Sequence, residues 1–299
     1  AYEVIGGEVK KITVIADEGV FKNGFSCAIP GTQEKGNEMA AVLGVIAGDS
    51  SLGLKVLENL CDEDVLKARK MIQEGKVNVQ VKRGLADIFI DAIVETDKGV
   101  GRSVIKDKHT NIVLVEKNSK VIFKEDNREH VLMEKGFNIK ELKLKQIVDF
   151  VNVVPHEDIT FVLEAVKVNK ELAEEGKQGQ GMGVGKGIFS LVEDGILCDD
   201  IITHAQRLTG YATDARMGGI PRPAMSICGS GDHGLIAVMP LVAIAEKKHI
   251  DDERLARSIV LSYLVTMYIK AFSGRLSAFC GCAVAAGSGV SAAACYLLG

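Results

Sequence analysis

Apolar and polar residues alternate with a period of two along most of the first 125 residues, which is the pattern of half-buried β-strands. The alternation predicts strands at 9–17, 76–83, 86–96, 99–107, 111–117 and 120–125. The short connections at 97–99 and 118–119 are typical of hairpins. We therefore expect the strands from residue 76 onward to form an antiparallel meander.

Between the first strand and the meander, the pattern predicts one extended segment and a pair of helices. Residues 25–31 alternate as a strand would, with Cys27 on the core face. Residues 37–48 and 52–75 have apolar positions three and four apart, as in amphipathic helices. Residues 1–138 are thus expected to form an α+β domain with an antiparallel sheet and flanking helices.

After about residue 138 the apolar period changes to 3.6, the period of α-helices. Helices are predicted at 141–154, 157–176, 188–195, 199–216, 235–248, 252–272 and 275–298. The last of them has no charged residue from Leu276 to Leu298, which is long enough to span a membrane. It is rich in Ala, Gly and Ser, however, and therefore fits a helix buried at the centre of a bundle. The fold class expected for the whole chain is α+β, with an all-α domain at 139–299.

Composition and charge remove several classes of function. A net charge of −4, a pI near 5.9, the absence of Trp and the scattered Phe and Tyr give no reason to expect nucleic acid or an anionic membrane as a partner. Seven cysteines without a secretory signal indicate reduced thiols and a cytoplasmic protein. The chain begins without an initiator Met and stops inside an apolar pattern, so we expect it to be an internal piece of a longer protein.

The segment with the most unusual composition is DARMGGIPRPAMSICGSGDHG, at 214–234, which holds five glycines. Its last part opens onto an apolar helix, so free N–H groups and the positive helix end favour an anion such as a carboxylate. Arg216 could pair either with Asp214 or with a substrate carboxylate, and His233 could orient a ligand, act as a base or cap the helix. The candidate substrate-binding residues of this segment are Arg216, Ser230, Gly231, Asp232 and His233.

The cysteines divide into two groups by their surroundings. Cys61, Cys198 and Cys295 stand in helical patterns and are expected to be buried apolar residues. Cys228, Cys280 and Cys282 stand beside glycines and could bind metal, although a C-x-C pair alone is a weak signal. The glycine run at 179–187 lacks the G-x-x-x-x-G-K-[ST] pattern and is not a phosphate-binding P-loop.

Seven motifs together resemble the bacterial and archaeal L-cysteine desulfidases, which belong with the iron–sulfur L-serine dehydratase alpha chains. They are KNG…PGT at 22–32, GK at 75–76, HTNI at 109–112, DARMGG at 214–219, PAMS…GSGDHG at 223–234, DDERLARS at 251–258 and RLSAFC at 275–280. The resemblance implies a [4Fe-4S] cluster, no pyridoxal phosphate, and conversion of L-cysteine to pyruvate, ammonia and hydrogen sulfide.

The resemblance also assigns roles to single residues. Cys280 is the first candidate for a cluster ligand, Cys228 and Cys282 are further candidates, and Asn23 joins the substrate-binding set. The family's catalytic cysteine lies in a Gly-Cys-Thr-Glu-Pro motif, which this sequence lacks. Two alternatives stay open: an L-serine dehydratase, and a non-catalytic protein that binds an amino acid and regulates. The expected partners are a small amino acid and a second copy of the chain.

Overall fold

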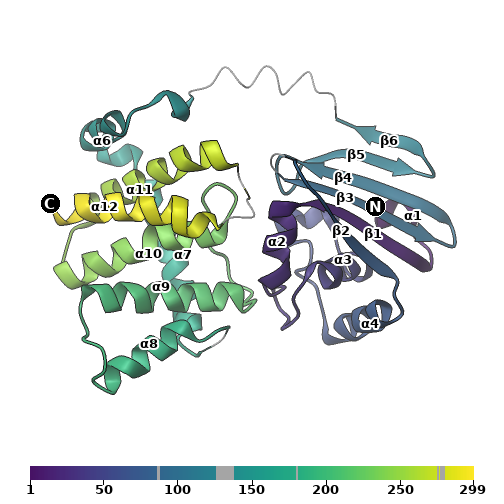
Figure 1. The fold of residues 1–299 in the computed structure, drawn as a ribbon, viewed down its shortest axis with the longest axis horizontal. Coiled ribbons are helices and arrows are strands. Elements are labelled where there is room, and N and C mark those ends of the chain that lie inside the picture. The colour runs from purple at the N-terminus through teal and green to yellow at the C-terminus, as the bar shows by residue number, and fades with distance from the viewer. Residues whose placement is uncertain (86–87, 126–137, 180, 275, 277–279) are drawn as a thin grey trace. The chain divides into compact units, whose positions relative to one another are not determined.

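A computed structural model describes residues 1–85, 88–125, 138–179, 181–274, 276 and 280–299 (Figure 1). The chain is α+β, as the apolar pattern predicts. It divides into two compact units, the first made of residues 1–137 with 276–279 and the second of 138–275 with 280–299. Each unit has a hydrophobic core of its own.

The first unit is built on a mixed sheet with the strand order β2-β1-β3-β4-β5-β6 (Figure 1). The strands are β1 (Val9–Asp17), β2 (Val77–Lys82), β3 (Phe89–Thr96), β4 (Gly99–Lys106), β5 (Ile112–Lys117) and β6 (Lys120–Lys124). Strands β3 to β6 form the expected antiparallel meander. Strand β2 does not join it: β1 lies between β2 and β3, and Ile12 pairs with Val77 in parallel and with Val94 antiparallel. The expected antiparallel pairing of 76–83 is therefore wrong, because the helices between β1 and β2 provide the crossover that a parallel pair needs.

Helices of the first unit cover part of this sheet. They are α1 (Tyr2–Ile5), α2 (Glu18–Ser26), α3 (Asn37–Ile46), a 3₁₀ turn at Ser50–Lys55, and α4 (Asp62–Gln73). Helix α3 packs on β1 and β2, and α4 packs on α3. Ile12, Met39 and Leu43 lie at the centre of the core that results.

Two segments of the first unit differ from the sequence prediction. Helix α2 replaces the first part of the strand expected at 25–31, because the Asp17 carboxylate caps the helix and accepts hydrogen bonds from Gly19 N (2.7 Å) and Val20 N (3.0 Å). Phe25 is accordingly exposed. The helix expected from residue 52 is a 3₁₀ turn interrupted at Gly53, whose φ is 57°.

The second unit is helical. Its elements are 3₁₀ turns at Ile139–Glu141, His156–Asp158 and Thr160–Val162, then α6 (Leu144–Val153), α7 (Leu163–Gly176), α8 (Val184–Glu193), α9 (Ile201–Met217), α10 (Gly231–Lys248), α11 (Asp252–Ser273), a π turn at Cys282–Ala286 and α12 (Gly287–Leu298). Helix α10 touches α7, α9, α11 and α12 and is the most buried of them, whereas α8 packs on α9 at the edge of the unit (Figure 1).

The Ala/Gly-rich last helix is not the buried centre that its composition predicted. In α12 one face is buried, at Gly289, Ala293 and Leu297, while Leu298 is exposed. The central position belongs to α10. Cys61, Cys198 and Cys295 are all exposed, which corrects the expectation that they are core residues. Of the described helices, one (Asp252–Ser273) is long and apolar enough to cross a membrane, and half of its most apolar window is buried in the protein.

Candidate functional site

The glycine-rich segment ends in a tight turn that leads directly into α10, which begins at Gly231, before the predicted start at residue 235. Ile227 and Ser230 exchange backbone hydrogen bonds of 3.2 and 3.1 Å, and the two residues between them, Cys228 and Gly229, have φ of 52° and 78°. Two central residues with positive φ define a type I′ turn. The Ser230 side chain then caps α10, its Oγ accepting from His233 N at 3.4 Å.

Arg216 reaches this helix start from the end of α9. Its Nε lies 3.8 Å from Asp232 Oδ1. A Cβ added at Gly231 would come within 2.5 Å of the same Nε, so the arginine lies across the first residue of α10 only because that residue is glycine. The structure thus places Arg216 beside Gly231 and Asp232, while the role of Arg216, Ser230, Gly231, Asp232 and His233 in substrate binding stays a prediction.

The sequence analysis considered Asp214 as a partner of Arg216, but in the structure its carboxylate binds the start of another helix. Its Oδ2 accepts a hydrogen bond of 2.8 Å from Gly185 N, so it caps the start of α8. Burial raises the pKa of the Asp214 carboxyl, and the N–H groups of Gly185, Val184 and Gly183 oppose that rise. The ion pair of Arg216 that the structure shows at α10 is with Asp232.

The side chain of His233 lies close to Gly281, the residue between Cys280 and Cys282. A Cβ at Gly281 would lie 2.5 Å from His233 Nε2 and 3.2 Å from Lys270 Nζ. His233 and Lys270 are each only 4% exposed. The Cys280–Gly281–Cys282 segment therefore lies against a buried histidine and a buried lysine.

Lys270 was missed by the sequence analysis. It lies in α11, inside the apolar run LVTMYIKAF, where one lysine among apolar residues was its only signal. Burying a lysine costs several kcal/mol unless the environment compensates its charge. Because Lys270 and His233 both lie against Gly281, Lys270 lies beside the candidate site.

The cysteines were tested as ligands of an iron–sulfur cluster. Cys280 is exposed, Cys282 is half-buried at the start of the π turn, and Cys228 occupies the I′ turn. A cluster takes three or four cysteine ligands. Within the described ranges, no three His, Cys, Asp or Glu side chains are close enough together to hold a metal ion. The described residues thus do not complete a cluster site, and of the RLSAFC motif the structure describes only Leu276 and Cys280.

Asn23 lies in the first unit, on α2. Its Nδ2 donates a hydrogen bond of 2.7 Å to Gly19 O, one turn earlier in the same helix. Its role in substrate binding stays a prediction.

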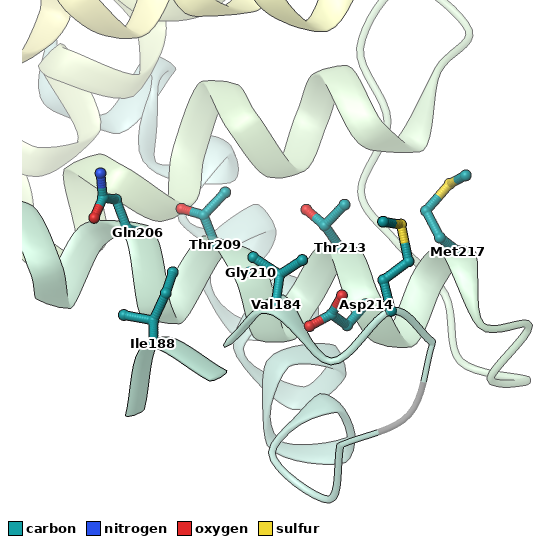
Figure 2. A pocket seen from close by; sticks show the side chains of 9 residues that line it. Val184, Ile188, Gln206, Thr209, Gly210, Thr213, Asp214 and Met217 are labelled. Atoms are coloured by element: carbon teal, nitrogen blue, oxygen red, sulfur yellow. The ribbon is translucent and has the colours of Figure 1, made fainter. Parts of the chain in front are cut away.

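A cavity of about 490 Å³ opens between α8 and α9 (Figure 2). Its lining is mostly apolar, and none of the residues of the α10 turn contribute to it. The lining residues are Met182, Val184, Ile188, Gln206, Thr209, Gly210, Thr213, Asp214 and Met217. The cavity is therefore separate from the charged site at α10.

The fold and site define an α+β protein in which the first turn of a buried helix follows a glycine turn, carries an aspartate paired with an arginine, and places a buried histidine against a cysteine segment. Residues 51–299 match the model of the serine dehydratase alpha chain family, and the chain belongs to that family. Proteins of this family are generally lyases.

Several relatives are similar to this chain over its whole length. A UPF0597 protein of Clostridium botulinum (strain Okra / Type B1) is 51% identical over 305 residues, covering 100% of this chain and 70% of the relative. UPF0597 proteins of Clostridium tetani (strain Massachusetts / E88) and Clostridioides difficile (strain 630) are 41% and 38% identical; each covers 100% of this chain, and the chain covers 70% and 71% of them, respectively. No solved structure matches the chain significantly.

Proposed function

We propose that the chain is part of an iron–sulfur lyase that eliminates hydrogen sulfide from L-cysteine, without pyridoxal phosphate. The observation that carries the proposal is the first turn of α10, where Arg216 lies beside Gly231 and Asp232 and the buried His233 lies against Gly281 of the cysteine segment. In the reaction the α-proton leaves, the Cβ–S bond breaks with its electron pair on sulfur, and the sulfide takes up a proton. The aminoacrylate that remains reacts with water to give pyruvate and ammonia.

The residues of the chain would bind and orient the amino acid. The carboxylate of the substrate would bind at the start of α10. The guanidinium of Arg216 supplies positive charge there, and the N–H groups of Gly231 and Asp232 supply hydrogen-bond donors. Preorganised hydrogen-bond donors around the substrate carboxylate also stabilise the negative charge that develops on the neighbouring α-carbon when the α-proton leaves. His233, buried behind them, would fix the substrate from the side of the cysteine segment.

A [4Fe-4S] cluster is part of the proposal because the family is generally iron–sulfur-dependent. Cys280 is our first candidate ligand, with Cys228 and Cys282 as further candidates. The remaining ligands would have to come from outside the described residues.

An L-serine dehydratase is the second candidate function. It uses the same elimination with hydroxide in place of sulfide as the leaving group, and the description of the matching family favours it. In this proposal the charged groups at α10 would bind the carboxylate and ammonium groups, which cysteine and serine share, so they would not select between the two.

Anaerobic preparation of this chain, beside the Clostridium botulinum relative, tests the proposal. We expect chelatable iron, acid-labile sulfide and sulfide release from L-cysteine; pyruvate release from L-serine at a higher kcat/KM would instead favour the dehydratase. Cys280→Ser should lower the iron content, whereas Cys295→Ser, at an exposed position of α12, should not. Iron-free, inactive preparations of both proteins that still bind L-cysteine would support a non-catalytic binding protein and contradict the lyase.

A further inference from the structure

The Asp232 carboxylate has one oxygen whose hydrogen bonding is incomplete. Its Oδ1 is fully buried and accepts no hydrogen bond from any described residue, although the side chain as a whole is 23% exposed. The Arg216 Nε, at 3.8 Å, is beyond hydrogen-bond distance. A buried acceptor left in this state is costly, and native structures usually supply a donor to such an atom. Among the described residues, the Asp232 Oδ1 therefore has an ion-pair partner in Arg216 but no hydrogen-bond donor.

We infer that Asp232 binds the α-ammonium group of an amino acid whose carboxylate is bound by Arg216. The inference rests on the proposed function and assigns the two charged side chains to the two charges of the ligand. An ammonium group offers three donors and no acceptor, so it suits a carboxylate oxygen that accepts no hydrogen bond. In an amino acid, the ammonium nitrogen and the carboxylate carbon are about 2.5 Å apart. A neighbouring arginine and aspartate can therefore engage both ends of one zwitterion.

Helix electrostatics alone do not account for this arrangement. An acidic residue in the first turn of a helix is stabilising through the helix dipole. That effect requires neither a buried oxygen nor an arginine across the helix start. Asp252, in the first turn of α11, is an exposed acid that gains the same dipole interaction. It is therefore the matched control for Asp232.

The inference predicts selectivity for the α-ammonium group. L-serine should bind more tightly than glycerate, in which a hydroxyl replaces the ammonium group. A hydrogen bond to a charged group contributes about 1.5–3 kcal/mol, so we expect Asp232→Asn to weaken L-serine binding by roughly tenfold to a hundredfold. Glycerate binding should be unchanged or stronger in this variant, because the lost negative charge no longer repels its carboxylate.

Isothermal titration calorimetry with L-serine and glycerate tests the assignment. Arg216→Met should weaken both ligands by similar factors, since both have the carboxylate, and Asp252→Asn should change neither. If the unmodified protein binds L-serine and Asp232→Asn keeps the same preference over glycerate, the inference is wrong and the proposed function stands. If the unmodified protein binds neither L-serine nor L-cysteine, the proposed function fails and the inference fails with it.

Discussion

A methyl group at Gly185 should destabilise the helical unit, although alanine is ordinarily a better helix former than glycine. Gly185 lies near the start of α8, where this helix crosses α9. A Cβ at this position would be 2.5 Å from Tyr211 Cδ1, 2.5 Å from Tyr211 N and 3.0 Å from Gly210 C. Two of these three atoms belong to the backbone of α9. The contact can therefore be relieved only if the two helices separate.

The magnitude follows from three contributions. Overpacking of this kind costs about 1–3 kcal/mol. Separation of the helices also weakens the bond from Gly185 N to Asp214 Oδ2, a hydrogen bond to a charged group that contributes about 1.5–3 kcal/mol when intact. The higher helix propensity of alanine returns about 1 kcal/mol. With part of the capping bond lost, we expect a net loss of about 2 kcal/mol in the free energy of unfolding.

Gly187 provides the control because it lies in the same helix and a Cβ there would meet no atom within 4 Å. Gly187→Ala should stabilise α8 by about 0.5–1 kcal/mol. The two variants thus differ in predicted sign as well as size. Urea denaturation followed by far-ultraviolet circular dichroism, with amide hydrogen exchange of α8, measures both. Equal stability of the two variants would refute the close crossing of α8 and α9.

Three further predictions concern the sheet, the site and pH. Arg102→Met should cost about 2–4 kcal/mol in urea denaturation, because it leaves the buried Asp91 carboxylate without the guanidinium that now binds both its oxygens at 2.9 Å; an unchanged midpoint would mean that water replaces the guanidinium. Gly281→Ala should lower the proposed lyase activity with little loss of stability, since it displaces only the ends of the buried histidine and lysine side chains, whereas Gly287→Ala, with ordinary packing distances, should leave that activity intact. Burial raises the pKa of Asp214 above its ordinary 3.8, so the native state keeps the carboxyl proton to higher pH than the unfolded chain does. The contribution of Asp214 to the free energy of unfolding therefore falls as pH rises from the unfolded-state pKa to the native-state pKa. The stability of Asp214→Asn relative to the unmodified protein should therefore rise with pH from about 4 and then level off; a pH-independent difference would contradict the raised pKa.

The local part of the fold was predictable from sequence because period and turn chemistry are local signals. Strand β1 has the predicted bounds, and the turn at 97–99 joins β3 and β4 as expected. The insertion of β1 between β2 and β3 was not predicted, since strand order depends on pairing between residues distant in the chain. The length of chain between β1 and β2, with room for helices, was a signal of a parallel crossover. The cap at Asp17 was likewise a signal for α2 that the alternation of residues 25–31 obscured.

The candidate site was predictable in its residues and less so in their contacts. The turn and helix start at Ser230 follow from glycine and capping chemistry, which act over a few residues. Lys270 and its approach to Gly281 depend on the packing of α11 against the end of the chain, which no local pattern describes. The exposure of Cys295 has the same origin: a small-residue helix packs closely on one face, and composition does not say whether it also packs on the other.

The two glycine-rich segments show why glycine content alone does not locate an anion site. Gly181 and Gly183, before α8, have positive φ, and Gly185 lets α9 approach, so this run serves turns and helix packing. At the start of α8 the protein supplies its own anion, the Asp214 carboxylate, and an additional phosphate or carboxylate would be repelled there. At the start of α10 the cap is the neutral hydroxyl of Ser230, with a guanidinium beside it. In the proposed assignment the two helix starts therefore differ in what caps them, and the α8 cap comes from a residue 29 positions away from the glycine it binds.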